Sequence, residues 1–375
     1  MLFPNDIQTA LLFDRPVAVL EGIVRDFMRV EEARTGARFN VPEAKPGVFC
    51  RLFGGGELSI TLEYVDRPPN LELFQKTLAS AVTGIICPDI RERLTKCRSH
   101  ILVNVSHGVL GSSEQVDRLM ELIGRPKEGH SLPQLLRRME VCALIGRIAC
   151  DHAPAQAVHW TQSNQLIPGE AFEEMAKLSA PGPLHIHPYL FGSAKGPDGK
   201  ARVGIRSFGA RHFIGRELLI EPSELPWAAN YETMLAFLRV ATTDKGYVIP
   251  DGDTFGPEDR SLSYRVVHRE AEPDDVPLFE LQPLMYREFG FVAPDYVPPE
   301  RVFDDRMPPA DLMPPDQEAK MALANEWREK RALAEGIGGR FEVRARHGDG
   351  NAPPPPPVRP VPGFGNRPVF GRKKA

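Results

Sequence analysis

Two stretches, GELSITLEYVDRPPNLELFQKTL at 56–78 and GRELLIEPSELPWAANYETMLAFL at 215–238, share one pattern. Each begins with apolar residues typical of a strand, crosses a turn that contains proline, and ends with apolar residues at helical spacing. In the first stretch apolar and polar residues alternate from Leu58 to Tyr64, so this strand is expected to bury one face only. The shared pattern predicts two halves related by duplication.

The sequence around each stretch extends it to the order strand, helix, strand, strand, helix, strand. In the first half, strands are expected at 9–14, 48–53, 58–64 and 101–107, and helices at 17–30 and 70–78. In the second half, strands are expected at 157–161, 184–191, 202–208, 217–221, 247–249 and 262–268, and helices at 169–178 and 228–240. The predicted fold class is therefore α+β, with two ferredoxin-like β-α-β-β-α-β halves.

Proline content marks the predicted domain boundaries. Of the 37 prolines, 15 lie from Pro294 onward, where the chain cannot supply the backbone donors that helices and sheets need. Two helices, at 113–123 and 131–150, are expected to join the halves. The predicted divisions are a first half at 1–110, a linking helical pair at 111–152, a second half at 153–293, a proline-rich extension with one exposed helix (316–335) at 294–347, and a disordered, basic, proline-rich tail at 348–375.

Composition limits the class of protein and of partner. The 375 residues are 42% hydrophobic and 26% charged with a net charge of -4, which is ordinary for a globular chain and gives no reason to expect nucleic acid. No apolar run is long enough for a membrane span, and Asp14 and Arg15 interrupt the apolar residues near the N-terminus. These features predict a cytoplasmic protein that binds neither nucleic acid nor membrane, and they leave its oligomeric state open.

The cysteines indicate neither disulfides nor zinc. Cys142 and Cys150 fall on the apolar helix expected at 131–150, where a reduced thiol packs like a small hydrophobe. The five cysteines are an odd number at wide spacings with no Cys-x-x-Cys pair: Cys50, Cys87, Cys97, Cys142 and Cys150. We predict no metal and no cofactor.

Histidines provide the first candidate binding site. His185 and His187 would lie on the same side of one strand, as two metal ligands could. A metal site needs a third and usually a fourth ligand, and no HExxH motif or cysteine cluster supplies one. His159 and Trp160 could add ligands or a stacking surface only if the fold brings their strand to this one. These four residues are candidate binding residues.

The segment YVIPDGDTFG at 247–256 is the second candidate. It resembles the phosphate-transfer motif of haloacid dehalogenases, but Phe255 stands where that motif has a small residue. As a calcium loop it lacks the bidentate glutamate, because Leu262 occupies that position. The favoured interpretation is a tight turn in which Gly252 has positive φ and aspartate side chains accept backbone N–H groups. The candidate binding residues of this segment are Asp251, Asp253 and Thr254.

Familiar catalytic signatures are absent from the sequence. It has no GxSxG, no Walker loop and no GxGxxG after a strand, and the glycines at 54–56 fall within a predicted hairpin, not at a strand–helix junction. The tail offers a different kind of site, because a PxxP segment is a preformed ligand for aromatic-lined grooves. The candidate recognition residues of the tail are Pro357, Arg359 and Pro360.

A family resemblance rests on six stretches: ALLFDRPV (10–17), SHILVNV (99–105), AVHW (157–160), FIGRELLIEPSELPW (213–227), DKGYVIPDGDTFG (244–256) and YRVVHRE (264–270). They resemble a bacterial family named domain of unknown function 4261. The resemblance covers roughly residues 9–269 and is most specific from GRELLIEP to DGDTFG. It implies a cytoplasmic bacterial protein of α+β fold. That family has no established activity, so the resemblance implies no catalytic residue.

Two functions are compatible with these observations. The absence of catalytic signatures and the presence of the tail favour a non-catalytic binding or interaction protein with a protein partner, such as a scaffold or an immunity-like protein. The alternative is a hydrolase or metal-dependent enzyme. That alternative requires the convergence of at least three of five side chains, His159, His185, His187, Asp251 and Asp253.

Overall fold

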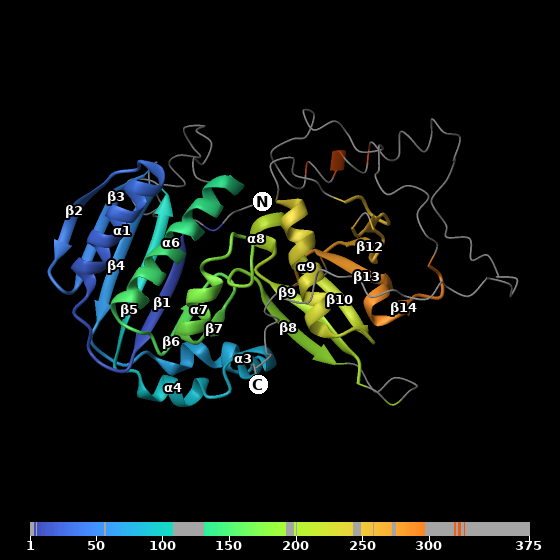
Figure 1. Ribbon diagram of the computed structural model, residues 1–375, viewed down its shortest axis with the longest axis horizontal. Coiled ribbons are helices and arrows are strands. Elements are labelled where there is room, and N and C mark those ends of the chain that lie inside the picture. The colour runs from blue at the N-terminus through green and yellow to red at the C-terminus, as the bar shows by residue number, and fades with distance from the viewer. Residues whose placement is uncertain are drawn as a thin grey trace, which may run out of the picture.

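The computed structural model describes residues 6–55, 58–107, 131–192, 199, 201–242, 249–257, 259–271 and 275–296, together with Pro4, Ala319, Ala322, Leu323 and Glu326. Across these residues the chain forms two β-sheets that stand side by side, each with helices packed against it (Figure 1). The fold is mixed α+β, as predicted. Within the described ranges, no helix combines the length and the apolar character needed to cross a membrane.

The first sheet, sheet A, is antiparallel throughout and has the strand order β2-β3-β4-β5-β1-β6-β7. The edge strand β2 is exposed apart from Phe39, and it contains Pro42 and a register shift, two features that discourage further pairing at a sheet edge. The strands of sheet A are β1 (Ile7–Phe13), β2 (Phe39–Lys45), β3 (Phe49–Gly54), β4 (Leu58–Val65), β5 (Ser99–His107), β6 (Ala157–Trp160) and β7 (Gln165–Ile167).

Helices cover both faces of sheet A. On one face, α1 (Leu20–Thr35) and α6 (Leu132–His152) pack against the strands and against each other (Figure 1). A capping box of Ser131 and Gln134 starts α6, satisfying donors that the first turn leaves free. Short helices on the other face enclose a small separate core with Leu12 of β1. These are η1 (Leu71–Phe74), α2 (Gln75–Leu78), α3 (Ala81–Ile86) and α4 (Ile90–Lys96).

A buried carboxylate joins α1 to α6. The side chain of Glu31 is 0% exposed, forms an ion pair with Arg137 of α6 and a second one with Arg34 at 3.2 Å, and accepts a hydrogen bond from Thr35 Oγ1 at 3.0 Å. A carboxylate is tolerated in the interior when such partners surround it. These contacts hold α1 in place on the sheet.

The second sheet, sheet B, has the order β11-β12-β13-β10-β9-β8, with β14 also paired to β13. Strands β10 and β13 are parallel and the other pairs are antiparallel. Helix α9 (Trp227–Ala241) packs on this sheet, and its apolar face joins a core that continues into sheet A. The remaining elements are β8 (His187–Gly192), β9 (Val203–Phe208), β10 (Glu217–Ser223), β11 (Thr254–Phe255), β12 (Leu262–Arg269), β13 (Leu278–Tyr286), β14 (Phe291–Val292), α7 (Gly169–Met175), α8 (Arg211–Ile214) and η2 (Arg287–Phe289).

The duplicated ferredoxin-like arrangement is not confirmed. In a ferredoxin-like unit, two strands joined by a helix lie parallel with one strand between them. Here β5 and β4 both lie between β1 and β3, and β1 pairs instead with β5 and β6. The hairpin of β6 and β7 is part of sheet A, although the prediction placed 157–161 in the second half, and the central strand β13 was not predicted. Sequence patterns identify a strand but not its neighbours.

The outcome for the other predicted segments is mixed. The long helix predicted at 131–150 is confirmed as α6, whereas its predicted partner at 113–123 lies outside the described residues. The tail, with Pro357, Arg359 and Pro360, also lies outside them. Of the helix predicted at 316–335, four residues are described and all four are helical: Ala319, Ala322, Leu323 and Glu326.

Candidate functional site

Three of the predicted site residues lie where sheet A touches sheet B. The β6–β7 hairpin and the start of α3 come from sheet A, and the segment that leads into β8 comes from sheet B (Figure 1). We call this contact the junction. Its members, all buried, are Ser80, Trp160, Ser163, Gln165, Leu184, His185 and His187.

Side chains of the β6–β7 hairpin hold the segment before β8 by hydrogen bonds. Ser163 Oγ donates to the carbonyl of Leu184 at 2.8 Å. Gln165 Nε2 donates to the carbonyls of Pro183 at 2.8 Å and Leu184 at 2.9 Å. Ser163 and Gln165 are almost fully buried, and the carbonyls that they contact have no partner in a strand. The side-chain donors therefore supply the hydrogen bonds that water would otherwise make to these carbonyls. The polar side chains of the hairpin therefore act as hydrogen-bond donors to backbone carbonyls of the junction.

His185 is a packed, neutral imidazole. Its ring is 3% exposed and stands edge-on to Trp160 and Phe213, with ring centroids 5.5 and 6.1 Å away. The backbone N–H of Gly182 donates to Nδ1 at 3.2 Å, so the neutral ring carries its proton on Nε2. Burial lowers the pKa of His185 to about 4, which keeps the ring uncharged at neutral pH. The residue is part of the interior.

His187 forms a serine–histidine pair that sequence reasoning did not predict. Its Nε2 lies 2.7 Å from Ser80 Oγ, a separation typical of a nucleophile and its general base. However, His187 and Ser80 are only 6% and 7% exposed, and burial lowers the pKa of the imidazole to about 4. Burial alone accounts for this low pKa, and no carboxylate offsets it by stabilising the protonated ring. The imidazole of His187 is therefore a poor proton acceptor. The pair fits a structural contact better than a catalytic one.

His159 lies on the opposite face of sheet A from Trp160. Its ring packs edge-on against Phe74 with centroids 5.1 Å apart, and its Nε2 is 3.2 Å from Asn164 Oδ1. The same oxygen accepts a hydrogen bond from Thr77 Oγ1 at 2.8 Å. Desolvation lowers the pKa of His159. The three candidate histidines are thus each engaged in different packing contacts.

The aspartate segment forms the predicted turn. Gly252 has a φ of 78°, and Asp251 Oδ1 accepts the backbone N–H of His268 at 2.8 Å. The carbonyl of Asp253 accepts the N–H of Val266 at 2.8 Å, while Thr254 pairs with β12 as part of β11. The turn is therefore fastened to β12 by its own backbone and by one carboxylate.

The structure does not bring the histidines and the aspartates together. The turn adjoins β11, at one edge of sheet B, and His185 and His187 lie at β8, at the other edge. The four strands in between make five inter-strand spacings, which corresponds to about 24 Å at ~4.8 Å per spacing. Among the described residues, no three His, Cys, Asp or Glu side chains gather in a way that could hold a metal. The enzyme alternative therefore lacks the convergence that it requires.

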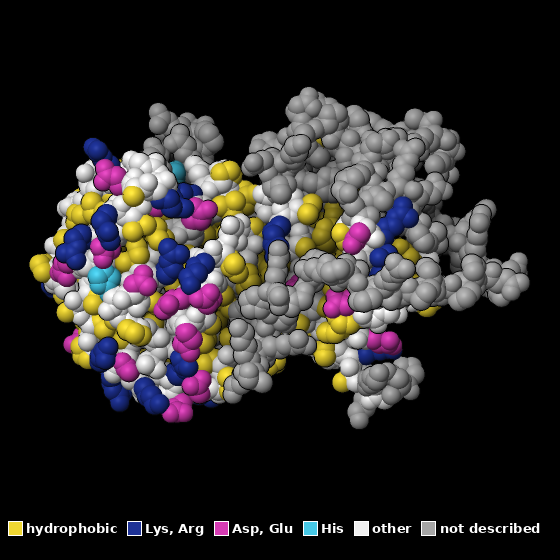
Figure 2. Space-filling view, viewed as in Figure 1, with side chains coloured by type: hydrophobic (Ala, Val, Ile, Leu, Met, Phe, Trp, Pro, Cys, Tyr) yellow, Lys and Arg dark blue, Asp and Glu magenta, His cyan; other side chains and the backbone are white. Residues whose placement is uncertain are grey.

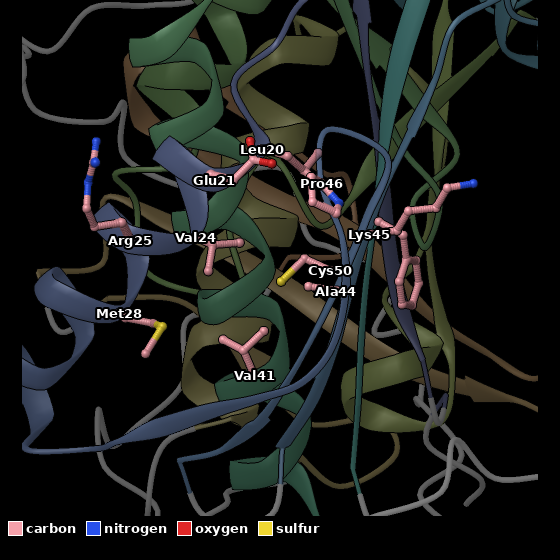
Figure 3. A pocket seen from close by; sticks show the side chains of 11 residues that line it. Leu20, Glu21, Val24, Arg25, Met28, Val41, Ala44, Lys45, Pro46 and Cys50 are labelled. Carbon is pink, nitrogen blue, oxygen red and sulfur yellow. The ribbon is translucent and has the colours of Figure 1, made fainter.

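A groove on the surface of sheet A was not predicted. It lies between α1 and the strands β2 and β3 and has a volume of about 370 Å³ (Figure 3). Figure 3 shows Val24, Val41 and Cys50 pointing into the space from three sides. We call it the α1–β2 groove. Its lining consists of Leu20, Glu21, Val24, Arg25, Met28, Val41, Ala44, Lys45, Pro46, Phe49 and Cys50.

The charges of the α1–β2 groove are at its margins. Glu21 Oε1 accepts the backbone N–H of Gly47 at 2.7 Å, which ties the β2–β3 turn to α1 and lowers the pKa of the carboxyl. Arg25 and Lys45 extend away from the space on two sides (Figure 3), and neither makes an ion pair with a described residue. Burial, with the nearby charge of Glu21, raises the pKa of Cys50, so its thiol stays protonated. The groove is apolar inside, with two cations and the Glu21 carboxylate at its margins.

A second, smaller cavity of about 250 Å³ lies at the end of sheet B. Arg202 and Glu224 line it and form an ion pair with each other at 2.6 Å. Phe289 and Phe291 form its apolar side. Because the guanidinium already has its counter-ion, this cavity offers less to a ligand than the α1–β2 groove does.

One signal in the sequence could have indicated the groove. Leu20, Val24 and Met28 recur every four residues along α1, and such a stripe usually faces a core. Here Leu20 and Val24 are buried in the core, and the same stripe lines the groove that lies between α1 and the strands β2 and β3. No family model matches the chain, and neither a curated protein nor a solved structure shows significant similarity to it.

Proposed function

We propose that this protein is a non-catalytic binding module that takes an apolar segment of a protein partner into the α1–β2 groove. The observation that carries the proposal is an open apolar groove with a cation at each of two margins, Arg25 and Lys45. A scaffold and an immunity-like protein would both use such a surface. The residues that an enzyme would need are instead buried at the junction or lie at the far edge of sheet B.

Charge complementarity defines the partner segment. Neither Arg25 nor Lys45 has a counter-ion among the residues that the structure describes, so the complementary ligand carries Asp or Glu on both sides of its apolar residues. Figure 2 shows Lys and Arg interleaved with Asp and Glu over the helical face of sheet A, so these two cations are a local feature and not part of a basic patch. Such a pattern favours a protein ligand over nucleic acid.

The geometry favours anchoring by side chains over addition of a strand. Pro42 lacks an N–H, and the register shift between Asn40 and Glu43 bends β2, so its outer edge is poorly suited to extend the sheet. A volume of about 370 Å³ lies at the small end of ligand pockets, which span roughly 300–1,000 Å³. One or two buried anchors in such a pocket can supply most of the affinity of an interface.

The proposal is tested by selecting peptides from a display library on the full-length protein. The counter-selection uses the Ala44→Trp variant, which fills the groove with an indole at an exposed position on its wall. We expect the surviving peptides to share two apolar residues flanked by Asp or Glu. Binding of these peptides should fall at least tenfold in Arg25→Glu/Lys45→Glu.

The matched control is Lys76→Glu/Arg239→Glu, which makes the same change in net charge at exposed positions outside the groove. Peptides should bind this control and the wild type equally. Enrichment of Lys- and Arg-rich peptides, or equal losses in the two charge variants, would contradict the proposal. So would survivors that bind Ala44→Trp as well as the wild type.

A further inference from the structure

The contacts between the two sheets depend on imidazoles that are buried without a counter-ion. From sheet B, His185 packs on Trp160, His187 meets Ser80, and the ring of His212 on α8 hydrogen-bonds to the backbone of Gln162. The remaining bonds that we find across the junction run from Ser163 and Gln165 to backbone carbonyls and carry no charge. Neutral histidine rings thus take part in the contact between the sheets, beside the apolar core that both sheets share.

Few charged or titratable groups face these rings. Trp160 and Phe213 surround His185, and Tyr231, whose hydroxyl donates to the carbonyl of Ile186 at 2.6 Å, stays protonated because burial raises its pKa. On α8 the charged neighbour of His212 is a cation, Arg211. On β10, Glu217 is buried, but its carboxylate is engaged by Ser207 Oγ at 2.6 Å and by the N–H groups of Gly209 and Ala210 at 3.0 and 3.1 Å.

Protonation of the rings would therefore place positive charge in the interior without a carboxylate to balance it. Such a charge is costly in an apolar setting, and the cost disappears when water reaches the ring. We propose that the junction is an acid-sensitive hinge, where protonation of His185 and His187 separates the β6–β7 hairpin and α3 from β8 while each sheet keeps its own strand pairing. The strand pairing survives because no strand pair joins sheet A to sheet B in the described residues.

The direction of the pH effect follows from the sign of the pKa shifts. Both rings have a pKa of about 4 in the closed junction and about 6.5 when exposed to water, so the closed form binds fewer protons. The closed form is fully favoured above pH ~6.5 and loses that advantage as the pH falls toward 4. For two independent rings, the equilibrium constant for opening rises about 500-fold between pH 7 and pH 5.

The test uses the fluorescence of Trp160 in the full chain, with Trp227→Phe and Trp327→Phe removing the other two tryptophans. Trp160 is 0% exposed beside His185, so opening should shift its emission to the red and increase quenching by acrylamide. We expect this change between pH 6 and 4.5 while the far-ultraviolet circular dichroism stays constant. If emission and dichroism change together in one transition, the hinge does not exist.

A variant separates the histidines from the carboxylates, which also titrate on acidification. His185→Gln/His187→Gln keeps polar groups for Gly182 and Ser80 but cannot gain charge, so the fluorescence change should move at least one pH unit lower. The control, His152→Gln, removes a partly exposed histidine at the end of α6 that pairs with Asp26 of α1. An unchanged midpoint in the double variant would overturn the proposal. If that variant does not fold at pH 7, the single variants His185→Gln and His187→Gln replace it, and each should move the midpoint of the fluorescence change to lower pH.

Discussion

The junction and the α1–β2 groove use opposite kinds of residue for opposite purposes. The junction contains histidine, serine, glutamine and tryptophan, which are the residues of active sites, yet every one is buried and engaged in packing or in holding backbone. The groove contains valine, methionine, alanine and cysteine, which are ordinary core residues; Val24 and Cys50 are buried, whereas Val41 and Ala44 on β2 are exposed. In this protein, residue type alone does not distinguish a packed interior from an exposed surface.

The largest expected effect is on the junction. Trp160→Ala removes a side chain that is 0% exposed and that packs against Phe172 and His185, so we expect a loss of about 3–5 kcal/mol in the free energy of unfolding. Denaturant unfolding followed by circular dichroism measures it. A loss below 1 kcal/mol would mean that the junction is loosely packed and that its side chains contribute no more to stability than those of the groove.

The next effect concerns the helix that the groove depends on. Glu31→Ala leaves Arg137 and Arg34 without the buried carboxylate between them, and because both guanidinium groups are partly exposed we expect a loss of about 1.5–3 kcal/mol in the free energy of unfolding. Glu140→Ala is the matched control, because Glu140 lies 3.6 Å from Arg34 but is half exposed. The control should lose less than ~1 kcal/mol. Equal losses would show that burial of the carboxylate does not matter.

A smaller effect tests whether the serine–histidine pair is structural. Ser80→Ala removes the hydrogen-bond partner of His187 in a buried setting, which should cost about 1–3 kcal/mol of unfolding free energy. Peptide binding in the groove should be unchanged, because Ser80 lies on the other face of sheet A. The measurements are denaturant unfolding and binding of the selected peptides. If the Ser80→Ala protein is stable but no longer binds the selected peptides, the binding site lies at the junction and not in the groove.

The smallest effect on stability should come from the groove. Val41 is 44% exposed on the edge strand β2, so Val41→Ala should change the free energy of unfolding by no more than ~0.5 kcal/mol. The same change should weaken binding of the selected peptides several-fold, because it removes two methyl groups from the groove wall. Calorimetric titration gives the affinity. Full affinity in Val41→Ala would exclude this wall from the binding site.

Much of the secondary structure followed from local patterns. The helix predicted at 131–150 matches the extent of α6 within two residues, and the Asp-Gly-Asp segment predicted a turn with positive φ at Gly252. The candidate site was less predictable. His185 and His187 were chosen for the chemistry of imidazole, which is the same in an active site and in a packed interior until the neighbours are known.

The sequence by itself determined many of the helical and extended segments, although not β13, because the spacing of apolar residues records which face of an element is buried. Only the tertiary structure decided which strands pair and what each buried face meets. β6 pairs with β1 across about 150 residues of sequence, which places the β6–β7 hairpin in sheet A and brings Trp160 to His185. The groove is likewise formed by α1 together with β2 and β3. Both outcomes depend on contacts between distant segments, and a local pattern carries no information about its partner.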